Sequence, residues 1–335
     1  MSRAVCIPFH RYHPHTTEHY RVWMNALLNG LAIWGKEFDK LYLIDDYWDF
    51  NFEELDRLNK LGIDYQIIKK QRDGHHWVQF KTAFPHIKED YCLFLDNDVL
   101  IWKEGVVANW FKQAEAGKFV TAFDGSGGLS EQMHRAFINL PAGTHRMGSY
   151  YFILNQRQLE VAKQVDLAPI HYRPGTFISE LKYTTVEGDW QDSFGALTIK
   201  LLGETDNLFV IDDDRASIYF EDTINKDPTT PKQLGYYHVR NGGHTTYLLS
   251  SKFGGDEAGY QHSLEITPRR ELMRIMAWHY LCADHTHDDD IASILVDIRV
   301  SEEAWQDYLY EFKNYHGLFN SSFTWEDNEG KVWTV

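Results

Sequence analysis

The sequence predicts an α/β protein whose mostly parallel sheet is covered by helices on both faces. Two observations lead to this fold class. Short, continuous apolar runs recur along the N-terminal part of the chain, and segments with an apolar stripe at helical spacing separate them. Strands that are apolar on both faces are typical of parallel sheets buried between helices. The chain has 335 residues, enough for one large domain or two modest ones at roughly 100–200 residues per domain.

In the N-terminal part, each strand run is followed by a helical pattern. Thr16 or Thr17 can cap a helix whose apolar stripe runs from Tyr20 to Leu31. A later helix ends at Gly62, a residue type that suits the left-handed conformation beyond a helix C-terminus. The expected strands are residues 4–9, 41–44, 63–68 and 91–95, and the expected helices after the first are residues 52–61 and 76–87.

The alternation continues beyond this point, and the chain then becomes mostly helical. Further helices are expected at residues 106–116, 156–165, 190–202, 269–283, 289–298 and 302–315. Further strands are expected at residues 118–123, 150–154, 208–211 and 234–239, with mixed extended and turn signals over 171–189. We therefore expect an α/β domain over residues 1–250 and a helical C-terminal extension, packed on it, over residues 265–335.

Composition and charge exclude several classes of protein. With 33 Lys and Arg against 49 Asp and Glu, the formal net charge is −16, which disfavours broad, non-specific binding to nucleic acid. A local basic strip that includes Lys69, Lys70 and Arg72 still leaves one edge where a phosphate group can bind. The three cysteines have no CxxC spacing, and no apolar segment approaches the ~20 residues of a membrane span. We expect a cytoplasmic protein without a membrane span.

The strongest local feature is Asp96-Asn97-Asp98, which stands between two apolar runs. Burying a carboxylate without a partner costs several kcal/mol, so the two acids need compensation. A divalent cation such as Mg²⁺ or Mn²⁺ supplies it, because hard ions take oxygen ligands. The motif follows the strand at 91–95, and ligands of open α/β sheets bind at the carboxyl ends of the strands. The other strand ends at that edge are residues 8–11, 45–46 and 69–76.

With this motif, the chain resembles the metal-dependent glycosyltransferases of the GT-A fold over residues 3–245. In that family, an Asp-x-Asp motif ends a strand of a Rossmann-like, nucleotide-binding half and holds the metal that bridges the diphosphate of a sugar nucleotide. The resemblance implies that Asp96 and Asp98 bind Mn²⁺ or Mg²⁺, with Asp96 acting directly, through water or on the ribose. It also implies a nucleoside-diphosphate sugar, most simply a UDP-sugar, as the donor substrate.

Three downstream segments extend the resemblance. Gly148-Ser149 is similar to the small-residue strand that lets the sugar and the acceptor approach the backbone, which places Ser149 at the donor. Three acidic residues before a helix resemble the acid that the family places beneath the acceptor: Glu187, Asp189 and Asp192. Which of them points toward the acceptor is open, and so is whether the stereochemistry is retaining or inverting. His238 matches a third metal ligand, followed by Arg240, which can neutralise diphosphate oxygens.

Four further positions complete the expected donor site. Lys81 lies where relatives carry a basic residue facing the donor. Asp46, or its neighbour Asp45, can accept a hydrogen bond from a pyrimidine or ribose, and Phe9 or Tyr47 can stack on the base. Arg72 belongs to the basic strip at the mouth of the crevice.

The sequence therefore predicts a hexosyl- or pentosyltransferase that moves a sugar from a nucleotide sugar to an acceptor hydroxyl. The acceptor is open among saccharides, protein side chains, small molecules and a hydroxylated nucleobase of viral DNA. A nucleotidyltransferase of the same fold is disfavoured, because the loop after the first strand contains no glycine. A non-catalytic module that binds nucleotide sugars is the alternative from another class, and calorimetric binding without turnover would distinguish it.

Overall fold

The structure is a computed structural model. It describes residues 1–10, 21–70, 75–124, 131–138, 146–191, 193–211, 235–238, 248–249, 251–267, 269, 272–273, 276, 288–316, 324–326 and 332–334. Everything stated below about structure concerns these residues.

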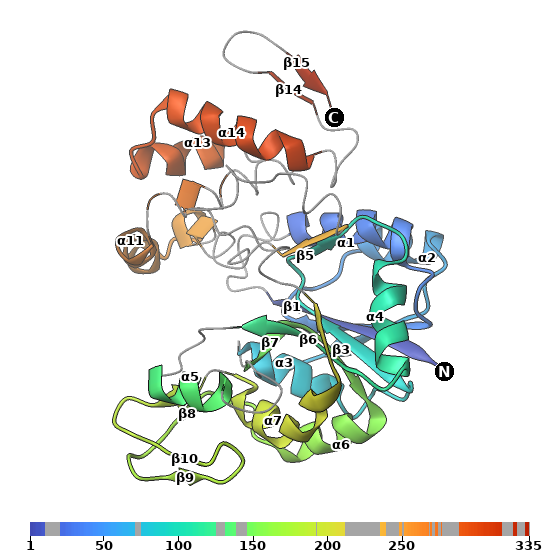
Figure 1. The fold of residues 1–335 in the computed structure, drawn as a ribbon. Helices are drawn as coiled ribbons and strands as arrows, with labels where there is room; N and C mark the ends of the chain where they lie inside the picture. The colour runs from blue at the N-terminus through green and yellow to red at the C-terminus, as the bar shows by residue number, and fades with distance from the viewer. Residues whose placement is uncertain are drawn as a thin grey trace.

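A seven-stranded sheet forms the centre of the fold, in the order β12-β6-β7-β4-β1-β2-β3 (Figure 1). Its strands are β1 (Arg3–His10), β2 (Lys40–Asp46), β3 (Tyr65–Lys69), β4 (Tyr91–Leu95), β6 (Phe119–Asp124), β7 (Arg146–Asn155) and β12 (Leu208–Ile211). Neighbouring strands pair in parallel except β7, which runs antiparallel to both β4 and β6. The expected mostly parallel sheet, with helices around it, is confirmed.

Helices cover both faces of this sheet. They are α1 (Arg21–Trp34), α2 (Phe52–Lys60), α3 (His76–Ala83), α4 (Val106–Glu115), α6 (Gln156–Gln164) and α7 (Gly195–Lys200). A further helix, α5 (Glu131–Ile138), packs through Met133 in a separate cluster with Ile178 and Ile199. Successive side chains of a strand point to opposite faces. In β1, Val5, Ile7 and Phe9 accordingly join the core shared with α1 and α4, whereas Ala4 and Cys6 join the core shared with α3, α6 and α7.

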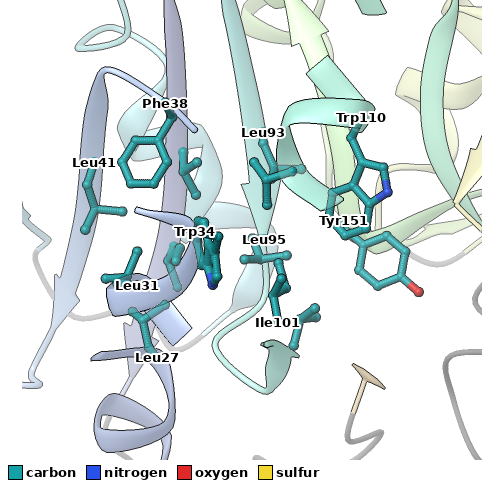
Figure 2. Packing of buried hydrophobic residues seen from close by; sticks show 14 of the residues in the cluster. Leu27, Leu31, Trp34, Phe38, Leu41, Leu93, Leu95, Ile101, Trp110 and Tyr151 are labelled. Carbon is teal, nitrogen blue, oxygen red and sulfur yellow. The ribbon is translucent and has the colours of Figure 1, made fainter. Parts of the chain in front are cut away.

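The core beneath α1 and α4 is rich in large side chains (Figure 2). Leu27, Leu31 and Trp34 of α1 approach Leu93 and Leu95 of β4. On the neighbouring strand β7, the ring of Tyr151 stacks on that of Trp110 from α4, with centroids 5.8 Å apart. Burial of such side chains contributes about 1.5–3 kcal/mol each, so the position of the strand ends is held by a well-packed interior.

Glu37 caps α4 from a distant part of the chain. Its carboxylate accepts hydrogen bonds from the backbone N–H groups of Gly105 and Ala108, both at 2.6 Å. An acid at a helix N-terminus satisfies otherwise unpaired donors and interacts favourably with the helix dipole. We expect Glu37→Ala to lower the free energy of unfolding by about 1–2 kcal/mol, measured by urea denaturation. Glu53→Ala, which removes an exposed carboxylate from α2, is the control, and equal stability of the two variants would contradict the capping role.

Two of the expected C-terminal helices are present as α13 (Asp288–Asp297) and α14 (Glu302–His316). The structure adds α11 (Glu257–Ile266), which was not predicted, and the hairpin β14 (Thr324–Glu326) with β15 (Val332–Thr334) follows α14 (Figure 1). Buried side chains of α11, α13 and α14 form one cluster with Trp23 of α1 and with Leu100, so these helices pack on the helix beside the sheet. No described helix is both long and apolar enough to cross a membrane. The helix expected at 269–283 lies mostly outside the described residues.

The helix expected over 190–202 is wrong for its first residues. Trp190 and Gln191 form strand β11, which pairs with β8 (Ile170–His171), and α7 begins only at Gly195. The reason is local: Phe194 adopts a left-handed conformation with φ of 67°, which no helix can include. The mixed segment before it contains a small hairpin of β9 (Phe177–Ile178) and β10 (Tyr183–Thr184).

Candidate metal centre

A strand–turn–strand unit positions the two acids of the Asp-x-Asp motif. β4 ends at Leu95, and a turn follows in which the N–H of Val99 donates to the carbonyl of Asp96 at 3.2 Å. The next strand, β5 (Val99–Ile101), pairs antiparallel with β13 (Tyr236–His238). This register puts His238 opposite Val99 and therefore beside Asp98.

Asp96, Asp98 and His238 thereby come together. One ligand atom from each lies within 4.8 Å of the other two, and Nε2 of His238 is 3.5 Å from Oδ1 of Asp98. His238 is 2% exposed and Asp98 is 7% exposed. Two carboxylate oxygens and one imidazole nitrogen suit Mn²⁺ well, whereas Mg²⁺ prefers oxygen ligands alone. The residues therefore fit a divalent cation.

The electrostatics of Asp96 agree with this donor set. Burial raises the pKa of the Asp96 carboxyl, and His76 opposes that effect. The nearby Asp98 raises the same pKa further, because two carboxylates at one place disfavour a second negative charge. A cation bound between them would remove this repulsion.

His76 contacts the site although it was not predicted as a partner of Asp96. Its Nε2 lies 2.5 Å from Oδ1 of Asp96. His76 is the first residue of α3. Its ring forms T-shaped pairs with the rings of Phe80 and Phe194, at centroid distances of 4.8 and 6.1 Å. The sequence could have indicated this contact only through the topology, since α3 begins at the same edge of the sheet at which β4 ends.

Asp46 is the centre of a second polar cluster, at the ends of β1, β2 and β3. Its side chain is fully buried, and Oδ2 contacts three donors: His10 Nδ1 at 2.8 Å, Gln79 Nε2 at 3.0 Å and Lys70 Nζ at 3.3 Å. Within the described residues, Oδ1 has no hydrogen-bond partner. Burial opposes ionisation, but the contacts from His10, Gln79 and Lys70 outweigh it, and the pKa of Asp46 lies below its usual range.

This cluster predicts a specific loss of stability in acid. A lowered folded-state pKa stabilises the protein above the unfolded-state value of about 4, and this contribution is lost as the pH falls toward the folded-state pKa. Asp46→Asn removes the titrating group, so we expect lower stability at pH 7 and a shallower decline below about pH 4. Urea denaturation at a series of pH values measures both. The exposed Asp64→Asn is the control, and parallel pH curves for the wild type and Asp46→Asn would contradict the assignment.

Phe9 is a core residue, which corrects its prediction as a base-stacking side chain. It is fully buried, and its ring packs against Trp48 at 4.8 Å and against Phe50 at 5.6 Å. No ring face is left at the surface for a nucleobase. The physical reason is the strand alternation, which turns Phe9 to the same face as Val5 and Ile7.

Lys81 also has a structural role here. Its Nζ donates to the carbonyl of Val165 at 3.2 Å, at the C-terminus of α6. A cation at this position satisfies a terminal carbonyl and favours the helix dipole. The side chain thus joins α3 to α6, and its predicted contact with a donor has no support in this geometry.

Of the three acids predicted beneath the acceptor, Asp189 is the best defined. It is 2% exposed, and its Oδ2 accepts from the hydroxyl of Tyr183 and the N–H of Val186, both at 2.7 Å. Glu187 is exposed within the same turn. Asp192 lies outside the described residues. The segment is nevertheless connected to the metal centre, because Phe194 touches the His76 ring.

The remaining predicted donor residues are less informative. Ser149 lies in β7, one residue after Gly148, which pairs with Ala122 next to an irregularity in the strand register. Arg72 and Arg240 lie outside the described residues. The structure thus brings together Asp96, Asp98 and His238, with His76 added.

A scan of protein-family models and a search of curated proteins found no match to this chain. Similar solved structures include the galactosyltransferase LgtC in complex with donor and acceptor sugar analogs, at 11% identity over 71% of this chain and 87% of that one, with a TM-score of 0.39. Another is glucosyl-3-phosphoglycerate synthase from Mycobacterium tuberculosis in complex with phosphoglyceric acid, at 13% identity over 63% and 69%, with a TM-score of 0.37.

A third similar structure is UDP-glucose pyrophosphorylase complexed with UDP-glucose, at 9% identity over 50% of this chain and 81% of that one, with a TM-score of 0.32. Nucleotide-sugar enzymes of the GT-A type are thus among the solved structures that resemble this chain. The likeness is partial at these TM-scores.

Proposed function

We propose that this protein is a metal-dependent glycosyltransferase, which transfers a sugar from a nucleoside-diphosphate sugar to an acceptor hydroxyl. UDP-sugars are the donors we favour. The observation that carries the proposal is the approach of Asp96, Asp98 and His238 to within 4.8 Å of one another at the carboxyl edge of a parallel sheet. Ligands of open α/β sheets bind at this edge.

In this proposal, Asp98 and His238 hold the cation, and Asp96 completes the set directly or through water. When bound, the cation supplies electrostatic stabilisation of the negative charge that develops on a diphosphate leaving group. The carboxylates and the imidazole are buried or half-buried, so the lower local dielectric strengthens each charge interaction. We assign Ser149, which follows Gly148 in β7, to the side of the sugar.

The acceptor is oriented, in the same proposal, by an acid that precedes α7 in the sequence. We assign this role to Asp192, because it precedes Phe194 by two residues and Phe194 contacts His76. Asp189 serves the turn instead, since Tyr183 and Val186 already donate to its Oδ2. An ionised acid near the acceptor hydroxyl can take up its proton as the new glycosidic bond forms.

A screen of nucleotide sugars tests this function. The purified protein is incubated with Mn²⁺ and a panel of UDP-, GDP-, ADP- and dTDP-sugars, and release of the nucleoside diphosphate is measured with and without acceptors. The acceptor panel contains saccharides, hydroxyl-bearing metabolites, peptides and hydroxymethylated DNA. We expect release from one class of donor, lost in the presence of chelator and restored by Mn²⁺. Release that persists in chelator, or donor binding without turnover on any acceptor, would contradict the proposal.

A further inference from the structure

We propose that His76 is a positioning residue for the metal centre, which holds the Asp96 carboxylate in the orientation that binds the cation. The inference rests on the proposed function, because it assumes that Asp96 belongs to a cation site. It adds to that function a residue on a different element of the fold. His76 begins α3, whereas the three candidate ligands come from the turn after β4 and from β13.

The first observation is that the Asp96 carboxylate depends on one contact. Of the residues that the structure describes, His76 alone is hydrogen-bonded to the Asp96 side chain, with Nε2 at 2.5 Å from Oδ1. The Asp96 side chain is 17% exposed and lies beside the negative charge of Asp98. Without the imidazole, charge repulsion and side-chain rotation would both move the carboxylate away from the orientation that a shared cation needs.

The second observation is that His76 itself is fixed. Its ring edge contacts Phe80 and Phe194, and Phe80 is fully buried. One turn further along α3, Gln79 donates to the buried carboxylate of Asp46 at 3.0 Å. Residues three apart lie on the same face of a helix, so this turn of α3 is joined to the ends of both β2 and β4. A hydrogen bond from such a support fixes its acceptor at little further cost in conformational entropy.

The size of the effect follows from metal sites in general. Residues that hydrogen-bond to metal ligands orient them, and their replacement lowers metal affinity or activity by about 10–100-fold. We expect this loss when the hydrogen bond to Asp96 is removed while the ring contacts are kept. His76→Phe does so, because phenylalanine retains a ring against Phe80 and Phe194 and offers no N–H group.

The experiment measures Mn²⁺ affinity in the absence of any sugar nucleotide, by calorimetry or by the electron paramagnetic resonance signal of free Mn²⁺. The variants are His76→Phe and His76→Gln, whose side-chain amide reaches the position of Nε2 and retains a donor. We expect an affinity about 10–100-fold weaker for His76→Phe and close to the wild-type value for His76→Gln. The exposed His86→Ala, beyond the other end of α3, is the control for loss of a histidine.

Wild-type affinity in His76→Phe would overturn the proposal. An equal loss in His76→Gln would also overturn it, because the affinity would then not depend on the hydrogen-bond donor that glutamine retains. A second set of variants keeps the test independent of folding differences. In an Asp96→Ala background, His76→Phe is expected to cause no further loss of affinity, since the two residues act as one unit. An additional loss of the full size would contradict action through Asp96. Failure of the proposed function is distinguishable, because Asp98→Ala would then leave Mn²⁺ binding unchanged.

Discussion

Replacing Asp98 by alanine is expected to lower kcat/KM for metal-dependent sugar transfer by at least about 100-fold, because a bound cation contributes several kcal/mol of charge stabilisation to the transition state. Asp98 is buried and lies 3.5 Å from His238, so its loss removes the ligand that joins the Asp-x-Asp turn to β13. The same change removes one of two neighbouring negative charges. We therefore expect the metal-free variant to be at least as stable as the wild type.

Initial rates at a series of donor concentrations and a series of Mn²⁺ concentrations measure the first effect, and thermal unfolding in chelator measures the second. Asp64→Ala is the matched control, because it removes an exposed carboxylate that pairs with Lys40 at the surface. The control is expected to retain both activity and stability, since exposed ion pairs contribute little. Wild-type rates for Asp98→Ala at any Mn²⁺ concentration would contradict a role for this residue in the metal centre.

Replacing Phe80 by alanine is expected to lower the free energy of unfolding by about 3–5 kcal/mol, the range for deletion of a buried aromatic side chain. Phe80 is fully buried in α3, and its ring lies edge-on to Phe94 at 5.4 Å and to Phe152 and Phe194 at 5.9 Å. Each edge-to-face pair contributes about 0.5–1.5 kcal/mol beyond the area it buries. The ring also supports His76, so the metal centre should weaken with the core.

Urea denaturation of Phe80→Ala and of Phe52→Ala provides the comparison. Phe52 is 85% exposed at the start of α2, and its replacement is expected to change stability by less than about 0.5 kcal/mol. A loss below about 1 kcal/mol for Phe80→Ala would show that this aromatic cluster does not hold α3 against the sheet.

The fold class could be predicted because it depends on local patterns. Apolar runs such as residues 91–95 form strands buried on both faces, and this pattern can be recognised without knowledge of distant segments of the chain. The short pairing of β5 with β13 could not be predicted in the same way. Each strand has three residues, and their register is set by contacts between distant segments. The break before α7 was missed because a positive φ at Phe194 has no sequence signal.

The candidate site was predictable in part, for physical reasons that differ between residues. The proximity of Asp96, Asp98 and His238 followed from the order of motifs in a known family, and the geometry brings their ligand atoms together. Strand alternation in β1 already indicated that Phe9 faces the core with Val5 and Ile7, so this error was avoidable. The contact between His76 and Asp96 could not be predicted from the sequence, because it depends on the rotation of α3 about its own axis.

We propose above that Asp98 and His238 bind one divalent cation together. Crystals grown with Mn²⁺ and UDP, measured at the manganese absorption edge, test this directly. We expect a single strong anomalous peak about 2.0–2.3 Å from a carboxylate oxygen of Asp98 and from an imidazole nitrogen of His238. A peak bound elsewhere, or UDP bound at this edge with no peak between these two residues, would contradict it.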